Sequence, residues 1–218
     1  MTYAELVSAI KGYAENDFPA TAGSFTSTDQ LNTFIRQAEQ RIYNSVQFPA
    51  IRKNVTGITT SGNKYLAMPV DFLASYSLAA IDPVTGDYEF LLNKDVNFIR
   101  AAYPKATDSG IPAYYALFDD NTFILGPTPD AAYSMELHYY YYPASIVDAG
   151  TSWLGDNFDS VLLYGSLLEA ASFMKSDNDT MKSYNDRYNE AMLLAKRLGD
   201  GMDRQDAYRS GQFRMDVK

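Results

Sequence analysis

The stretch STDQLNTFIRQAEQRI, residues 27–42, decides the fold class, because its apolar side chains recur at the spacing of one face of an α-helix. These apolar positions are Leu31, Phe34, Ile35, Ala38 and Ile42. Ser27 and Gln30 match a capping box, in which two side chains bond free backbone N–H groups of the first turn. Pro49 marks the end of the helix, since proline cannot continue it. The stretch therefore predicts an amphipathic helix with one face in a core.

Three further helices are predicted near the two ends of the chain, each from apolar residues at helical spacing. Their expected ranges are 3–13, 158–174 and 180–198. Thr2 and Glu5 form a capping box for the first of them. The expected signals for the other two are Asp156 or Asn157 as the N-terminal cap of 158–174, and Gly199 as the C-terminal stop of 180–198. A short polar link joins these last two helices, which predicts antiparallel packing.

Between residues 50 and 142 the pattern changes to short apolar runs separated by turn residues, which is typical of β-strands. Three hairpins are predicted around turns rich in Gly, Pro, Asn and Asp. They pair 55–60 with 64–68, 75–81 with 88–92, and 113–118 with 122–125. A tyrosine-rich strand at 132–142 follows them, and a helix at 93–103 ends before Pro104.

These elements predict an α+β fold in which the terminal helices form an antiparallel bundle and a small, mostly antiparallel β region is inserted between them. The expected divisions are 1–49 with 150–199 for the helical body and 50–149 for the β-rich region. Residues 200–218 are expected to be an extended C-terminal arm, because they are polar and mixed in charge but carry scattered apolar anchors.

Composition argues against most enzyme classes. The chain has 218 residues, 27 acidic and 18 basic side chains, a net charge of -9, no cysteine and one histidine. Disulfides, thiolate nucleophiles and sites needing two imidazoles from one chain are therefore excluded. The excess of acidic side chains also disfavours tight electrostatic binding of DNA around the protein, because phosphates are bound by lysine and arginine. No stretch approaches the roughly 20 apolar residues of a membrane helix, and the start lacks the apolar core of a signal peptide, so we expect no membrane anchor.

Two groups of residues merit a test as catalytic or metal sites. His138 shares one face of its strand with Glu136 and Tyr140, but no further ligands lie nearby in the sequence, so a structural role is favoured. Asp119-Asp120-Asn121 is the densest acidic cluster, yet hairpin turns favour these residue types for backbone reasons. We therefore expect no catalytic, cofactor-binding or metal-binding residues, and no cofactor.

Tyrosine is the residue in excess, with 18 in the chain. Tyr139, Tyr140, Tyr141 and Tyr142 are consecutive, so on a strand two would face each way. Tyrosine gives a large contact area at low entropic cost, which favours a subunit or tail interface here over sugar binding. In the C-terminal arm, arginines at five-residue spacing could pair with acidic residues of a neighbour.

Several ordered segments are similar to proteins of tailed bacteriophages. They are Ala38–Tyr43, Tyr65–Leu73, Gly110–Tyr115, Leu125–Asp130, Tyr139–Pro143 and Leu163–Ala170. Together they resemble the head-to-tail adaptor (connector) family, tail tubular protein A-like, of short-tailed phages. The resemblance covers roughly residues 30 to 200, and its specificity comes from the order of the segments, since none of them is a catalytic signature.

The resemblance implies a structural virion protein that forms a ring, expected to be a dodecamer, between the portal and the tail nozzle. It implies that helices form the ring body, that β elements face the tail proteins, and that the C-terminal segment reaches the portal. Tyr208, Arg209, Phe213 and Arg214 would then contact the portal or a neighbouring subunit. Genomic double-stranded DNA would pass through the lumen without sequence-specific binding. The protein is expected at the neck of the virion, after synthesis in the host cytoplasm.

Two alternatives remain open at this point. Exposed tyrosines would also suit a tail-associated carbohydrate-binding module. A cell-wall-degrading enzyme would need acidic residues or a histidine in a catalytic role, for which Asp119, Asp120 and His138 are the candidates.

Overall fold

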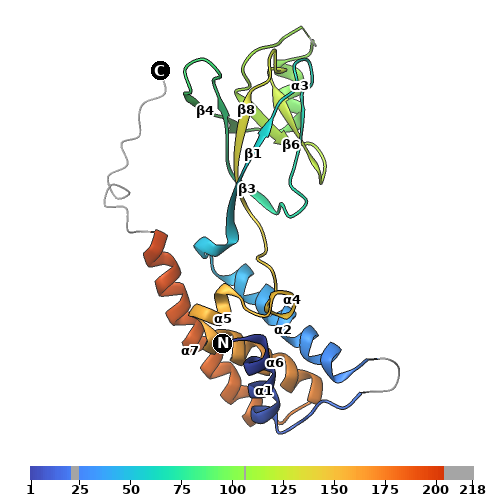
Figure 1. Cartoon of the computed structure of the whole chain (residues 1–218), viewed down its shortest axis with the longest axis vertical. Coiled ribbons are helices and arrows are strands. Elements are labelled where there is room, and N and C mark those ends of the chain that lie inside the picture. Colours follow the sequence, from blue (N-terminus) through green and yellow to red (C-terminus); the bar gives the residue numbers. More distant parts are fainter. Residues whose placement is uncertain (21–24, 106, 204–218) are drawn as a thin grey trace. The chain divides into compact units, whose positions relative to one another are not determined.

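The computed structural model describes residues 1–20, 25–105 and 107–203. The chain forms two compact units (Figure 1). The helical unit combines Met1–Ile51 with the chain from Pro143 onward, and the β unit is Arg52–Tyr142. The predicted α+β fold is thus confirmed, with the β-sheets inserted between helices from the two ends of the chain.

The helical unit is built around α6, which packs against α1, α2, α5 and α7. Because α6 has neighbours on several sides, apolar residues occur around most of its circumference rather than on one stripe. Gly165 allows α2 and α7 to approach α6 closely, since a Cβ there would lie 3.3 Å from both Ala38 Cβ and Tyr188 Cε2. The helices are α1 (Tyr3–Ala14), α2 (Ser27–Ser45), α4 (Ile146–Ala149), α5 (Trp153–Asn157), α6 (Asp159–Met174) and α7 (Asn178–Asp203), with the 3-10 turn η1 (Pro49–Ile51).

The cap of α1 is confirmed, whereas the predicted cap of α2 is wrong by one residue. Thr26 and Asp29 form the capping box of α2. Ser27 Oγ instead donates to the carbonyl of Asp17 (2.8 Å), and Gln30 Nε2 donates to the carbonyls of Pro19 (3.1 Å) and Phe25 (3.3 Å). Both residue pairs fit the sequence pattern of a capping box. Only the pair with Asp29 places a carboxylate against the positive end of the helix dipole.

Two further helix-end predictions are wrong. Asp156 and Asn157 belong to the short helix α5, and α6 begins after Phe158 without a side-chain cap. The last helix does not stop at Gly199 but continues to Asp203. A glycine inside a helix costs only about 1 kcal/mol, which neighbouring turns can offset.

The β unit contains two four-stranded sheets. The order in the first is β1-β8-β3-β4, all antiparallel, and the order in the second is β2-β7-β6-β5, with a parallel β5–β6 pair. Their strands are β1 (Arg52–Ile58), β2 (Tyr65–Ala67), β3 (Ala74–Ile81), β4 (Tyr88–Phe90), β5 (Leu92–Asn93), β6 (Tyr114–Leu117), β7 (Thr122–Gly126) and β8 (Ser134–Tyr140). The inner faces of both sheets supply one apolar core, and its members include Leu78, Phe123 and Leu137.

Two of the three predicted hairpins are confirmed, namely β3–β4 and β6–β7. The third is wrong, because β1 pairs with β8 in the first sheet and β2 pairs with β7 in the second. The link between β1 and β2 is bonded to the segment before β8: Thr59 N–H donates to Tyr133 O (3.0 Å) and Gly62 N–H donates to Pro129 O (2.8 Å). These hydrogen bonds fix the link where the chain passes from the first sheet to the second.

The short helix expected before Pro104 is confirmed as α3 (Val96–Ala102). Ile99 of α3 packs against Ala116 and Ile124 on the outer face of the second sheet. Gly126 permits this contact, since a Cβ there would lie 2.9 Å from Ile99 Cγ2.

Candidate functional site

The tyrosine-rich strand ends earlier than predicted, because β8 stops at Tyr140 instead of continuing to residue 142. Tyr139 and Tyr140 are the last residues of β8, and Tyr141 and Tyr142 follow the end of the strand. The strict alternation of faces therefore applies only to the first pair. Tyr139 is 1% exposed and belongs to the core, whereas Tyr142 is 38% exposed.

Tyr139 ties the end of β8 to an ion pair. Its hydroxyl donates to Asp71 Oδ1 (2.8 Å), and Lys53 Nζ donates to Asp71 Oδ2 (2.8 Å). These hydrogen bonds, first from Lys53 and then from Tyr139, lower the pKa of Asp71. Burial is the main reason why the pKa of Tyr139 is raised. The Lys53 ammonium also lies 5.1 Å from the ring centroid of Tyr141. This cluster holds the end of β8 in place and leaves Asp71 ionised.

Tyr140 belongs to a separate aromatic group on the outer face of the first sheet. Its ring meets that of Tyr76 edge to face, with centroids 6.0 Å apart. The Arg52 guanidinium lies 5.0 Å from the Tyr76 centroid and 5.9 Å from that of Tyr140. Tyr76 is half exposed. Aromatic residues and arginine are both enriched at protein interfaces, so this group suits contact with another protein.

His138 lies on the same outer face as Glu136, as the alternation of the strand predicts. Its Nε2 is 3.0 Å from Glu136 Oε1. Glu136 also accepts hydrogen bonds from Asn54 Nδ2 (2.8 Å) and Tyr88 OH (3.0 Å). These two bonds are the main reasons why the pKa of Glu136 is lowered. The side chains thus form a cross-strand polar network. Within the described ranges, no three acidic or histidine side chains are gathered as a metal ion would require.

The Asp119-Asp120-Asn121 cluster forms the turn between β6 and β7. Asp119 Oδ1 accepts a hydrogen bond from the Asn121 N–H (2.9 Å), and Phe118 N–H donates to Thr122 O (2.9 Å). Asp119 therefore stabilises the backbone of a tight turn, which is the structural role that the sequence favoured for it.

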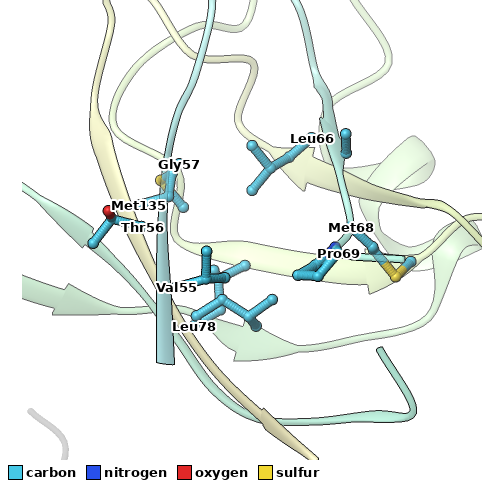
Figure 2. Close-up of a pocket in the computed structure, with 10 residues that line it drawn as sticks. Val55, Thr56, Gly57, Leu66, Met68, Pro69, Leu78 and Met135 are labelled. Carbon is cyan, nitrogen blue, oxygen red and sulfur yellow. The ribbon is translucent and has the colours of Figure 1, made fainter. Parts of the chain in front are cut away.

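A feature missed by sequence reasoning is an apolar cavity of about 210 Å³ at one side of the β unit (Figure 2). It opens between β1 and β2, and the Val55 and Leu66 side chains of these strands line it with the inward-facing Leu78 and Met135. A Cβ added to Gly57 would meet only Leu66 Cδ1, at 4.0 Å. Gly57 within a strand was the available signal, because an interior glycine often marks a place where another group approaches.

The predicted contact residues Tyr208, Arg209, Phe213 and Arg214 lie outside the described residues. In the part of the chain that is described, no helix has the length and apolar character needed to cross a membrane.

Comparison with known proteins agrees with the geometry, which offers contact surfaces and, among the described residues, no cluster of acidic or histidine side chains that could hold a metal ion. A search of curated proteins found no match to the chain. The family model described as SU10 adaptor protein matches residues 1–215, nearly the whole chain. This is a family of structural phage adaptors, so the expectation that the protein is not an enzyme is confirmed. The chain therefore belongs to the SU10 adaptor protein family of phage head-to-tail adaptors.

Proposed function

We propose that the protein forms a dodecameric ring in the neck of the virion, between the portal and the tail nozzle, through which genomic double-stranded DNA passes. The observation that carries this proposal is the family match over residues 1–215. A closed ring of identical subunits needs two different contact surfaces on each subunit, and a chain with two compact units can offer several.

The charge of the chain supports a conduit role. Its 27 acidic side chains outnumber its 18 basic ones, so a ring of many copies carries a large negative charge. Such a surface repels phosphates and limits adhesion of DNA that has to move past it. We therefore expect no sequence-specific binding of DNA.

The contacts within the neck follow from the same proposal. Helical units form the body of the ring, and β units contact the tail proteins. Tyr140, Tyr141 and Tyr142 contact a neighbouring subunit or a tail protein, while the buried Tyr139 positions the strand end that presents them. In the C-terminal arm, Tyr208, Arg209, Phe213 and Arg214 contact the portal or a neighbouring subunit.

Mass photometry of the full chain with and without purified portal rings tests the proposal. We expect monomers, or a mixture, for the protein alone and a discrete complex of the portal with about twelve added copies when both are present. Negative-stain images of that complex should show an added ring on the axis of the portal. A mass that never rises above that of the portal would contradict the proposal.

The carbohydrate-binding alternative is favoured by the half-exposed ring of Tyr76, which meets the ring of Tyr140 edge to face. A glycan array distinguishes the two functions. Specific binding that disappears in a Tyr76→Ala variant, without any complex on the portal, would support carbohydrate recognition instead.

A further inference from the structure

We propose that copies of this chain associate through opposite sides of the β unit, with Phe90 of one copy seated in the apolar cavity between β1 and β2 of the next. This inference rests on the ring proposed above and names one contact that would close it. The contact is head-to-tail, so each copy uses both surfaces, as a closed ring requires.

One side of the β unit is closed by the chain itself and carries exposed apolar side chains. The segment 88–93 leaves the first sheet as β4 and enters the second as β5, and Leu91 between them is buried. Tyr88, Phe90 and Leu92 alternate with Leu91 and therefore point away from the core, Tyr88 and Phe90 from the outer face of the first sheet at its β4 edge. They are 52%, 67% and 58% exposed. Apolar residues this exposed at consecutive outward positions indicate a contact surface.

The opposite side carries the matching recess. There β1 and β2 are the last strands of their sheets, and the apolar cavity opens between them. An apolar cavity of roughly 150 Å³ accepts benzene. The cavity of about 210 Å³ therefore has room for the ring of a phenylalanine. Edge strands also leave backbone groups available to a neighbour, and β1 is exposed along most of its length.

The charges on the two sides are complementary. Acidic residues accompany the exposed stripe, in β4 and the turn before it, and basic residues accompany the cavity, in β1 and just before β2. The acidic set is Asp82, Asp87 and Glu89, and the basic set is Lys53 and Lys64. Near the cavity, Asp71 is already bonded to Lys53. Opposite charges on the two surfaces favour this pairing and disfavour contact of like sides.

The strand register places the exposed stripe and the cavity at the same level along the strand direction. Phe90 lies opposite Ala79, Ala79 lies opposite Glu136, and Glu136 lies opposite Thr56, which lines the cavity. Neighbours arranged side by side, without a step along the strands, would therefore bring Phe90 level with the cavity. Such a step-free arrangement is compatible with a closed ring, in which successive subunits are related by rotation alone.

Disulfide trapping tests the contact, because the natural chain has no cysteine. Full-length Leu92→Cys and Val55→Cys variants, both of which keep Phe90, are mixed and oxidised, alone and with portal rings. Val55 lines the cavity and is 38% exposed. Ser160→Cys, exposed in α6, replaces Val55→Cys in the control mixture. We expect the cavity pair to form covalent heterodimers about tenfold faster or more than the control pair, since docking raises the local thiol concentration.

A filled cavity provides the second test. Gly57→Leu places a side chain in the cavity from β1 itself, and Gly57→Ala is the matched control that leaves it largely open. In the Val55→Cys background, Gly57→Leu should reduce trapping to the control rate and Gly57→Ala should retain it. Circular dichroism verifies that both variants are folded. Equal trapping rates for the cavity and control pairs in both conditions, or trapping that persists in Gly57→Leu, would overturn the proposal.

The outcome is separable from that of the proposed function. If electron microscopy shows rings of this protein on the portal while trapping fails, the function stands and this contact is wrong. If trapping succeeds but no complex forms on the portal, the contact stands and the location in the neck is wrong.

Discussion

The Glu39 side chain and the backbone N–H of Ile146 form a buried hydrogen bond of 2.9 Å, which joins α2 to the first turn of α4. Glu39 is 4% exposed. Burial raises the pKa of its carboxyl above the ordinary value of 4.5, against the opposing effects of the hydrogen bonds from Ile146 and Ser145. The bond holds the chain where it returns from the β unit into the helical unit.

Stability should respond to pH through Glu39. Because its pKa is higher in the folded than in the unfolded state, the folded state binds more protons above pH 4.5, and stability falls as pH rises through the folded pKa. Glu39→Gln keeps an acceptor for the Ile146 N–H but has no carboxyl that ionises. The free energy of unfolding of this variant should therefore rise relative to that of the wild type between about pH 4 and pH 7. Urea unfolding across that range measures the effect.

Glu5→Gln serves as the control of opposite sign. The backbone and side chain of Thr2 lower the pKa of the Glu5 carboxyl, so its stabilising effect is lost as pH falls. If the free energies of unfolding of both variants changed with pH in the same direction relative to wild type, the raised pKa of Glu39 would not be the cause.

The Tyr139–Asp71 hydrogen bond should contribute measurably to stability. Tyr139→Phe removes the donor and leaves the packing of the ring in place, so we expect a loss of about 1.5–3 kcal/mol, the usual range for a hydrogen bond to a charged group. Tyr141→Phe, at a ring that contacts the Lys53 ammonium through its face, is the matched control and should be nearly neutral. Chemical denaturation measures the free energy of unfolding of both variants. Equal destabilisation by the two substitutions would contradict the role of the Tyr139–Asp71 hydrogen bond.

Close helix packing should make position 165 intolerant of even one methyl group. A Cβ at Gly165 would be 3.3 Å from Ala38 and Tyr188, so Gly165→Ala should destabilise the protein by about 1–3 kcal/mol through overpacking. Gly12 in α1 has open space around it, and Gly12→Ala should stabilise by up to about 1 kcal/mol. Thermal unfolding measures both, and a stabilising Gly165→Ala would show that the helices move apart at little cost.

Deletion of residues 204–218 should abolish binding to portal rings while leaving the unfolding temperature unchanged. The proposed reason is loss of the contacts of Tyr208, Arg209, Phe213 and Arg214. Co-sedimentation with portal rings measures binding. Full-length Asp216→Asn, which alters the same segment without touching these four residues, should bind normally. A truncated protein that still binds would place the portal contact elsewhere.

The helices could be predicted because their information is local. The stripe from Leu31 to Ile42 lies within α2, and the turn at Asp119 lies between two strands that pair with each other. The partner of β1 is β8, far along the chain, and nothing in the alternation of Val55 or Gly57 identifies it. The predicted hairpin of 55–60 with 64–68 is wrong for this reason, because adjacent apolar runs around a glycine turn usually pair with each other.

The contact surfaces were only partly predictable for a related reason. Tyrosine content indicated an interface, but burial divides Tyr139 from Tyr142 and depends on where β8 ends. The cavity is formed by two sheet edges brought together by the whole fold. The capping error at α2 is different, because two overlapping patterns one residue apart were both valid and Gln30 had another use in tertiary structure.

The pairing of Arg52 with Tyr140 has a consequence for how this protein could have evolved. The first strand of the β unit lies beside its last strand, so the chain enters and leaves the unit at neighbouring points. A module attached in this way can be exchanged by recombination, or removed and replaced by a short connection, without breaking the helices on either side. Phages that share the helical unit could therefore carry different modules at this position, each matched to its own tail.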